Sequence, residues 1–171
     1  NNFLKAKAIS QISSPRLEAL IDLMFSPIKY QNSEAVIRQA TEMGVRSIFP
    51  TTFKRTINKK INLDKFNAYA LGATQQSGRL SIPKIDKLND LKSRSDILSD
   101  KTVLMFDENL EGIHLSQAKI KSNDEILVII GPEGGFEEEE RAFISNASKN
   151  FLNVSLGHNI LKADTAVIAA L

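Results

Sequence analysis

A glycine-rich turn over residues 131–135 carries the residue types best suited to holding a small molecule. Six mostly branched, apolar residues (125–130) precede it, and a run of four glutamates follows it. An apolar run of this kind is typical of a strand covered on both faces, and the Gly-Pro pair after it would end the strand. Gly134 and Gly135 permit positive φ angles and close approach to bare backbone. A strand, a turn and a helix in this order predict a ligand site at the carboxyl end of the strand.

The charge of the turn restricts which ligand it could hold. No Lys-Ser or Lys-Thr pair follows the glycines, and Glu133 with the glutamates behind it would repel a phosphate. The sequence also lacks a dinucleotide fingerprint. A neutral or cationic small molecule, held through backbone groups, fits the turn better. A tight strand-to-helix turn without a ligand is the alternative, since a single glycine motif is weak evidence.

Other apolar segments predict the elements that position this turn. Helical spacing predicts helices over residues 33–43, 63–76 and 88–98, and a last helix over 166–171 capped by Asp164 and Thr165. Apolar runs predict strands over residues 45–50, 103–106, 126–130 and 153–157. Strands that alternate with helices predict an α/β fold with a mainly parallel sheet and helices on both faces.

The composition is that of an ordinary globular protein and excludes several classes. The 171 residues are 42% hydrophobic and 25% charged, which suits one domain. The sequence contains no cysteine, which excludes a disulfide framework and a cysteine-based metal site, and we expect no metal. No apolar run reaches the length of a membrane span, so we expect no membrane contact. These features are compatible with a cytoplasmic protein.

Charge is distributed unevenly along the chain, although its net value is only +2. Residues 1–101 hold 17 Lys and Arg against 9 Asp and Glu, whereas residues 102–171 hold 5 against 11. The basic half favours a polyanionic partner such as nucleic acid. The most basic loop holds Lys54, Arg55, Lys59 and Lys60, which could contact phosphates without reading sequence. A solvated surface loop is the alternative.

Four segments, taken in order, resemble one known family. They are Ala40 to Val45, Gln75 to Arg79, Ile126 to Gly131 and Leu156 to Ala166. The resemblance is to the RsmE-type 16S ribosomal RNA uracil-N3 methyltransferases of the knotted SPOUT superfamily, and it covers residues 17–171. Four motifs in the right order and spacing are far more specific than one glycine turn.

The resemblance implies a fold, a cofactor and partners. The carboxy-terminal part of the sheet would thread through a loop as a trefoil knot, which is rare in proteins. The family resemblance implies S-adenosylmethionine (SAM) as cofactor, a homodimer, and 16S rRNA of the small ribosomal subunit as substrate. It also implies an amino-terminal PUA-like RNA-binding barrel. By this comparison residues 1–14 are a remnant of that barrel, and residues 15–171 form the methyltransferase domain.

Carried over by position, the resemblance implies three walls for the SAM pocket. The glycine turn would supply Gly131, Glu133, Gly134 and Gly135. The segment near the carboxyl terminus would supply Leu156, Gly157, Ile160, Leu161 and Thr165, and a neighbouring strand would end beside them with Leu104, Met105 and Phe106. A cationic sulfonium suits the acidic half of the chain, and adenine needs apolar walls and backbone hydrogen bonds.

The same resemblance implies the catalytic candidates. Methyl transfer to uracil N3 depends mainly on positioning, and a nearby cation would stabilise the anion left when the N3 proton departs. Arg79, in the Gln-Ser-Gly-Arg motif, is the first candidate for contact with the substrate or a phosphate, and Arg55 and Lys54 come next. Lys162 is a further candidate, because it stands where the family has an arginine. The alternative for Arg79 is a surface arginine that follows a helix end.

Two departures from the family pattern leave other functions open. Gln75-Gln76 replaces the usual Glu-Gln, so a carboxylate is missing there. Asn159 and Lys162 replace two arginines, which removes one charge and the bidentate fork of the other. One alternative is a knotted methyltransferase acting on another RNA position, against which the Gln-Ser-Gly-Arg segment argues. The other is a catalytically silent RNA-binding factor, which the changed loop permits.

Overall fold

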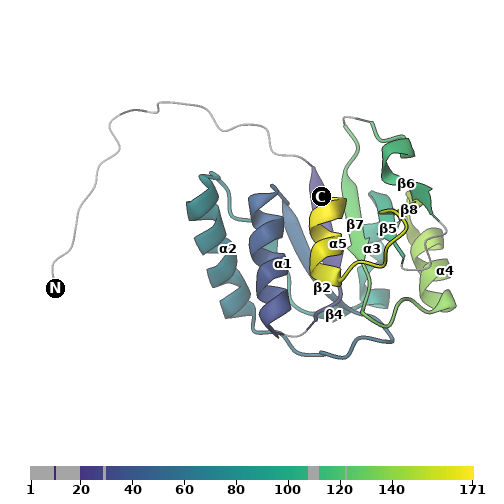
Figure 1. Ribbon diagram of the computed structural model, residues 1–171, viewed down its shortest axis with the longest axis horizontal. Coiled ribbons are helices and arrows are strands. Elements are labelled where there is room, and N and C mark those ends of the chain that lie inside the picture. Colours follow the sequence, from purple (N-terminus) through teal and green to yellow (C-terminus); the bar gives the residue numbers. More distant parts are fainter. Residues whose placement is uncertain (1–9, 11–19, 29, 108–111, 122) are drawn as a thin grey trace.

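A parallel β-sheet forms the middle layer of the structure (Figure 1). This computed structural model describes residues 10, 20–28, 30–107, 112–121 and 123–171, so the barrel remnant expected at residues 1–14 lies outside the described residues, Ser10 apart. The strands are β1 (Ile21–Phe25), β2 (Ser47–Thr52), β3 (Lys84–Ile85), β4 (Asn89–Asp90), β5 (Thr102–Phe106), β6 (Ile113–His114), β7 (Ile126–Ile130) and β8 (Asn150–Ser155). They lie in the order β3-β2-β1-β7-β5-β8-β6, with β4 beside β2, and these pairings are all parallel. The prediction of a mainly parallel sheet is confirmed.

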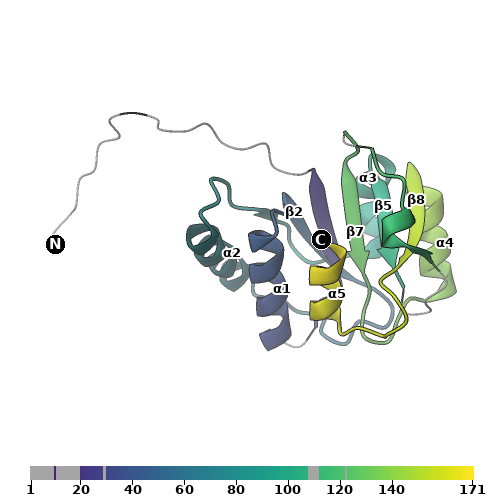
Figure 2. The same ribbon diagram turned by 45° about the horizontal axis from the view of Figure 1, so that its top comes forward.

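Helices cover both faces of this sheet (Figures 1 and 2). One face packs against α1 (Tyr30–Glu42), α2 (Leu63–Ser77) and α5 (Ala163–Ala170); the other packs against η1 (Leu91–Arg94), α3 (Ser95–Ser99) and α4 (Glu138–Ala147). Successive strand residues point to opposite faces, so in β5 Leu104 and Phe106 join the first core while Val103 and Met105 join the second. A strand buried on both faces must be apolar throughout, which explains the apolar runs of β5 and β7.

The helix predicted over residues 88–98 is replaced by β4, η1 and α3. The Asp90 carboxylate accepts the Ser93 amide at 3.1 Å and starts a tight turn at that point. The buried Arg94 guanidinium then donates to the Pro50 carbonyl at 3.0 Å and ties the turn to β2. The continuous helix was wrong because side-chain capping and a buried arginine override the helical spacing of the apolar residues.

The start of the last helix also differs from the prediction. Helix α5 begins at Ala163, so Asp164 and Thr165, predicted as its caps, lie in its first turn. There the Asp164 carboxylate accepts the Thr165 amide at 2.9 Å. The long segment after β5 was expected to be loop or weak helix, and its described part holds β6 and the short helix η2 (Leu115–Gln117). Among the described helices, none combines the length and apolar character needed to cross a bilayer.

A cluster of four charged side chains holds the strand starts together at the amino edge of the sheet. Asp22 in β1 is 1% exposed. Its carboxylate accepts a hydrogen bond from Arg46 Nη2 at 2.7 Å and forms an ion pair with Lys101 Nζ, also at 2.7 Å. Glu125 pairs with the same two cations at 2.6 and 3.1 Å. Because Arg46, Lys101 and Glu125 each stand directly before a strand, the cluster fixes the starts of β1, β2, β5 and β7 in register.

The cluster also sets how these carboxyl groups ionise. Burial by itself raises the pKa of Asp22, but hydrogen bonds from Arg46 and Lys101 outweigh it and hold that pKa below its ordinary value. Hydrogen bonds from the same two cations lower the pKa of Glu125 to about 2. Both carboxylates therefore stay charged in the folded protein under mildly acidic conditions in which the unfolded chain takes up protons.

Replacing Asp22 by asparagine removes the buried anion and leaves Arg46 and Lys101 with the half-exposed Glu125 in place of two carboxylates. We expect the free energy of unfolding at pH 7, measured by urea denaturation, to fall by about 3–5 kcal/mol. Because both folded-state pKa values are depressed, this stability is present above the unfolded pKa of about 4 and is lost as the pH falls towards 2. The variant should therefore show a weaker loss of stability across that window than the parent protein.

Glu34→Gln is the matched control, because Glu34 forms an exposed pair with Arg38 one helical turn away, at 3.0 Å. Its removal should change the free energy of unfolding by less than about 1 kcal/mol. Equal losses in the two variants would mean that the cluster at the strand starts contributes no more than a surface pair.

Candidate functional site

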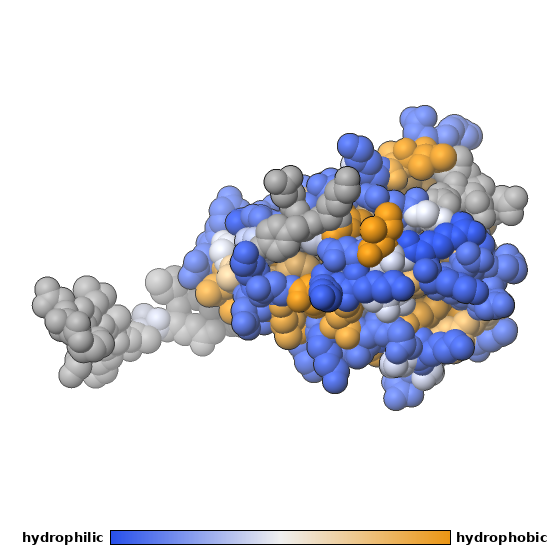
Figure 3. All heavy atoms as spheres, turned by 90° about the horizontal axis from the view of Figure 1, so that it is seen from below, coloured by the Kyte–Doolittle hydropathy of each residue, from blue (hydrophilic) through white to orange (hydrophobic). Residues whose placement is uncertain are grey.

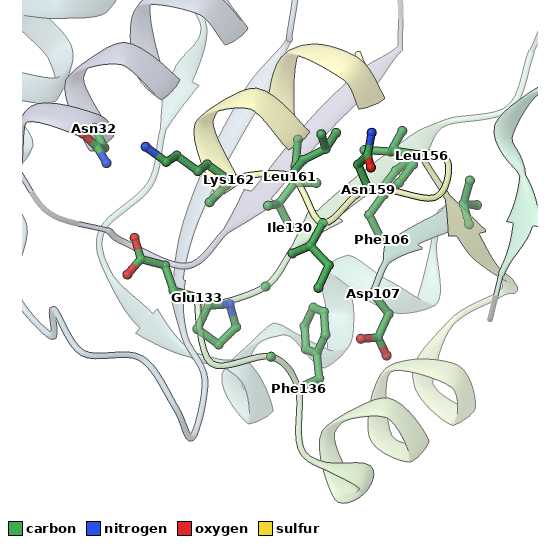
Figure 4. A pocket seen from close by; sticks show the side chains of 17 residues that line it. Asn32, Phe106, Asp107, Ile130, Glu133, Phe136, Leu156, Asn159, Leu161 and Lys162 are labelled. Atoms are coloured by element: carbon green, nitrogen blue, oxygen red, sulfur yellow. The ribbon is translucent and has the colours of Figure 1, made fainter. Parts of the chain in front are cut away.

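A cavity of about 500 Å³ opens at the carboxyl ends of β5, β7 and β8, on the side of the molecule that Figure 3 shows. Three segments far apart in the sequence line it: the strand ends, the turn 131–136 and the loop 156–163 that leads into α5 (Figure 4). Ligand sites in parallel α/β sheets lie in this position, because the connections after the strands diverge there. The structure therefore has a cavity at the glycine turn, where the sequence predicts a ligand site.

The floor of the cavity is apolar and depends on one glycine. Phe106, Ile130 and Phe136 are at least nine-tenths buried, and Figure 4 shows Ile130 between Leu161 and the ring of Phe136. A Cβ at Gly131 would lie 2.6 Å from Phe136 Cε2, so only glycine lets the ring fold back onto the strand end. The turn is closed by a hydrogen bond of 2.9 Å from the Gly135 amide to the Pro132 carbonyl, with Gly135 at a φ of 72°.

Glu133 and Lys162 lie at one end of the cavity. Figure 4 shows the Glu133 carboxylate and the Lys162 ammonium on the side of Asn32, whereas Leu156 and Asp107 lie on the other side. Within the described residues, neither Glu133 nor Lys162 makes a hydrogen bond or an ion pair through its charged group. The cavity therefore offers an apolar bed with one negative and one positive group available to a ligand at its rim.

The basic loop after β2 is docked onto the glycine turn. Arg55 Nη1 donates to the Gly134 carbonyl and Arg55 Nε to the Glu137 carboxylate, both at 2.7 Å. The Lys54 amide donates to Glu140 at 2.7 Å, and Glu140 also accepts the Glu137 amide in a capping box. The glutamates thus start α4 and anchor the loop, so Arg55 holds the turn in place.

The structure brings together most of the predicted cofactor-binding residues. Seven of them line the cavity: Phe106, Gly131, Glu133, Gly135, Leu156, Ile160 and Leu161; the catalytic candidate Lys162 joins them. Leu104 and Met105 lie behind the wall, buried within β5, and Gly134, Gly157 and Thr165 do not line the cavity. A Cβ at Gly134 would approach Arg55 at 3.3 Å, so Gly134 faces the docked loop.

Several lining residues were not predicted from the sequence. Asn32, Asp107, Asn159 and Phe136 line the cavity as well. Asp107 is 7% exposed and accepts a hydrogen bond from Arg141 Nη2 of α4 at 3.2 Å, which ties the end of β5 to that helix. Its position directly after an apolar strand could have pointed to the site, because parallel strands end at the ligand edge. The sequence offers no comparable signal for Asn32, which comes from the first turn of α1.

Arg79, the first catalytic candidate, lies at the opposite edge of the sheet. Its Nη1 donates to the carbonyls of Thr41 at 2.6 Å and Val45 at 3.1 Å, where α1 ends and the chain turns towards β2. These carbonyls belong to a helix end that needs donors from outside the helix. Within one chain the structure does not bring Arg79 to the cavity, and its guanidinium joins the end of α2 to the end of α1.

An apolar cavity with a few polar groups, at the carboxyl ends of parallel strands, defines a small-molecule-binding domain of the α/β class. The family model described as "RNA methyltransferase domain" matches residues 15–171. The protein named ribosomal RNA small subunit methyltransferase E in Rickettsia conorii is 31% identical over 99% of this chain and 70% of its own length. The chain therefore belongs to this RNA methyltransferase family, in its small subunit methyltransferase E group, and the resemblance noted in the sequence is confirmed.

Experimental structures of similar proteins agree with this assignment. The ribosomal RNA small subunit methyltransferase E of Neisseria gonorrhoeae, crystallised with bound S-adenosyl methionine, superposes with a TM-score of 0.82 at 26% identity. The match covers 94% of this chain and 67% of that one. A Legionella pneumophila methyltransferase in complex with the cofactor SAM matches with a TM-score of 0.77 at 29% identity, over 88% of this chain and 63% of that one.

Gly131→Ala tests how the floor of the cavity is built. The new methyl group would overlap the ring of the buried Phe136, so the ring or the turn must shift. We expect the free energy of unfolding to fall by about 1–3 kcal/mol in urea denaturation. Gly72→Ala is the control: Gly72 lies within α2, and an added Cβ meets no atom within 4 Å. The control should be stabilised by up to about 1 kcal/mol, and a loss of stability in both variants would contradict the role given to Gly131.

Proposed function

We propose that the protein is a SAM-dependent methyltransferase that methylates N3 of a specific uridine in 16S rRNA of the small ribosomal subunit. The observation that carries this proposal is the cavity at the ends of β5, β7 and β8, with its apolar floor and its pair of charged groups. The two similar proteins described with SAM support the choice of cofactor, and the name of the Rickettsia relative supports the choice of RNA.

The residues of the cavity fit SAM by their chemistry. The apolar side chains of Phe106, Ile130 and Leu161 offer a bed for the adenine ring, and the bare backbone of the turn 131–135 offers polar groups for its edge. Glu133 supplies a negative charge for a ligand with a cationic sulfonium. A phosphate group inside the cavity would meet that carboxylate unfavourably, so the same charge selects against a cofactor that carries phosphates.

The chain must position the uracil and manage the proton on N3. When bound, SAM supplies the methyl group. The Lys162 ammonium, exposed at the rim of the cavity, stabilises the anion that forms when the uracil N3 proton leaves to solvent, because a cation next to developing negative charge lowers its free energy. Arg55 contributes indirectly, because it holds the carbonyl of Gly134 and so the shape of the turn.

RNA would approach over the basic loop. Lys54, Lys59 and Lys60 are exposed on the same loop that docks onto the glycine turn. Ammonium groups at these positions contact phosphates and orient the RNA without reading its sequence. We propose that this loop and the cavity together form the substrate side of the domain.

Further properties of the family are proposed for this protein as well: a homodimer, a cytoplasmic location, a methyltransferase domain over residues 15–171, a barrel remnant over residues 1–14 and a carboxy-terminal trefoil knot.

Two contacts support the knot. A Cβ at Gly112 would lie 2.7 Å from backbone atoms of Asn153 and Val154, so Gly112, directly before β6, lies against β8. Helix α5 then packs against α1 and β7, so the chain passes over β5 after it leaves β8.

Methyl transfer from labelled SAM to small ribosomal subunits that lack their uracil-N3 methylation tests the proposed function. The modified nucleoside is identified by mass spectrometry after digestion of the RNA. N3-methyluridine is the expected product. Another methylated nucleoside would make the protein a methyltransferase for a different RNA position, and SAM binding without transfer would make it a silent binding factor.

Lys162→Ala tests the role of the ammonium. We expect kcat to fall about 10- to 100-fold while the Kd for SAM, measured by calorimetry, stays within about twofold. Lys162→Arg keeps the charge and should retain most of the activity. Lys149→Ala is the control, because Lys149 is exposed at the amino edge of the sheet, and it should behave like the parent protein. A parallel loss of SAM affinity and kcat in Lys162→Ala would instead place this residue among the cofactor contacts.

A further inference from the structure

Ile57 has the largest exposed fraction, 85%, among the large apolar side chains of the described residues. It lies in the basic loop between β2 and α2, close in sequence to Lys54, Lys59 and Lys60, which are exposed too. Single apolar residues on a surface are common and by themselves indicate nothing. Three further observations distinguish Ile57 from an ordinary exposed apolar residue.

The first observation is that the loop is fixed on both sides of Ile57. The Thr56 hydroxyl accepts the Phe53 amide at 2.8 Å and shares a buried hydrogen bond of 2.8 Å with the hydroxyl of Ser26. On the other side, Asn58 Nδ2 donates to the Ile28 carbonyl at 3.0 Å. Because both neighbours are anchored to the segment after β1, Ile57 is presented outward by the backbone and cannot fold into the core.

The second observation is a small depression beside Ile57. Pro27, Ile28, Pro132 and Glu133 line it together with Ile57. Pro132 and Glu133 also line the main cavity, so the two hollows share a wall. A flat group resting against Ile57 would therefore sit next to whatever the main cavity holds.

The third observation is the charge around the depression. Lys59 and Lys60 follow Ile57 closely in the loop, are exposed and supply positive charge, whereas Lys54 is paired with Glu139 at 3.7 Å. Ile57 and the two prolines supply apolar surface, and Glu133 adds one carboxylate to the lining. An occupant that matches both features has a flat, partly apolar face and a negatively charged backbone. A nucleotide of single-stranded RNA has this combination, because its base stacks and its phosphate binds ammonium groups.

We propose that Ile57 and the adjoining depression form a nucleobase subsite that positions the RNA substrate beside the main cavity. The inference rests on the proposed function and deepens it, since it names the residue that packs against the RNA. Apolar side chains hold splayed bases through dispersion and the release of water, with little dependence on which base is present. Ile57 thus positions the strand, and selection of the target uridine falls to other groups.

Fluorescence can report contact at this position, because the protein contains no tryptophan. In Ile57→Trp the new indole is the sole tryptophan, and titration with protein-free 16S rRNA at saturating SAM should quench it in a saturable way. Leu80→Trp is the matched control: Leu80 is 70% exposed and directly follows Arg79, at the opposite edge of the sheet, so its emission should stay nearly constant. Binding of the same RNA, labelled with a dye, is followed in parallel by anisotropy.

The outcomes separate this inference from the function on which it rests. RNA binding without quenching at position 57, or with equal quenching at position 80, overturns the subsite alone. Failure of the labelled RNA to bind either variant overturns the subsite as well, whereas the proposed function is overturned only if small ribosomal subunits also stay unmethylated in the transfer assay. Among activity variants, Ile57→Asp should raise KM for RNA about five- to tenfold with an unchanged Kd for SAM, whereas Leu80→Asp should leave both constants unchanged. An unchanged KM in Ile57→Asp overturns the subsite.

Discussion

The ring of Phe136 rests on the bare Cα of Gly131, and the architecture of the site depends on this contact. It lets β7 stop abruptly and turns the chain back under the cavity, so that α4 can start at its edge. Once α4 has started, its first glutamates hold the basic loop through Arg55 and the Lys54 amide. Because Gly131 has no side chain, the end of β7, the start of α4 and the loop after β2 can form one wall together.

The two edges of the sheet perform different tasks. The amino edge is fixed by Asp22 and Glu125 with their shared cations, and Arg79 closes the helix ends nearby. The carboxyl edge carries the cavity, and the charged groups at its rim, Glu133 and Lys162, are available to a ligand. The cluster at the amino edge keeps the strands in register, while the charged groups of Glu133 and Lys162 at the carboxyl edge stay unpaired within the described residues and can bind a ligand.

Much of this arrangement could be predicted from the sequence, because local signals carried it. The apolar runs predicted β5 and β7, and the glycine turn predicted where the cavity would open. The role of Arg79 could not be predicted in this way: the motif places Arg79 just after α2, but its hydrogen bonds to Thr41 and Val45 join residues far apart in sequence. The docking of Arg55 on Glu137 joins residues far apart in sequence, so no local pattern reveals it. For the same reason Asn32 was not predicted. The helix predicted over residues 88–98 does not form, because the Asp90 cap and the buried Arg94 stabilise a tight turn there.

Amide hydrogen exchange with and without SAM tests whether the cavity at the carboxyl edge holds the cofactor. If it does, the amides of Gly131, of residues 133–136 and of residues 156–163 exchange more slowly when SAM is added, with little change around residues 79–85 at the amino edge. Unchanged exchange in the turn and the loop, or protection confined to the amino edge, would mean that SAM does not bind in this cavity.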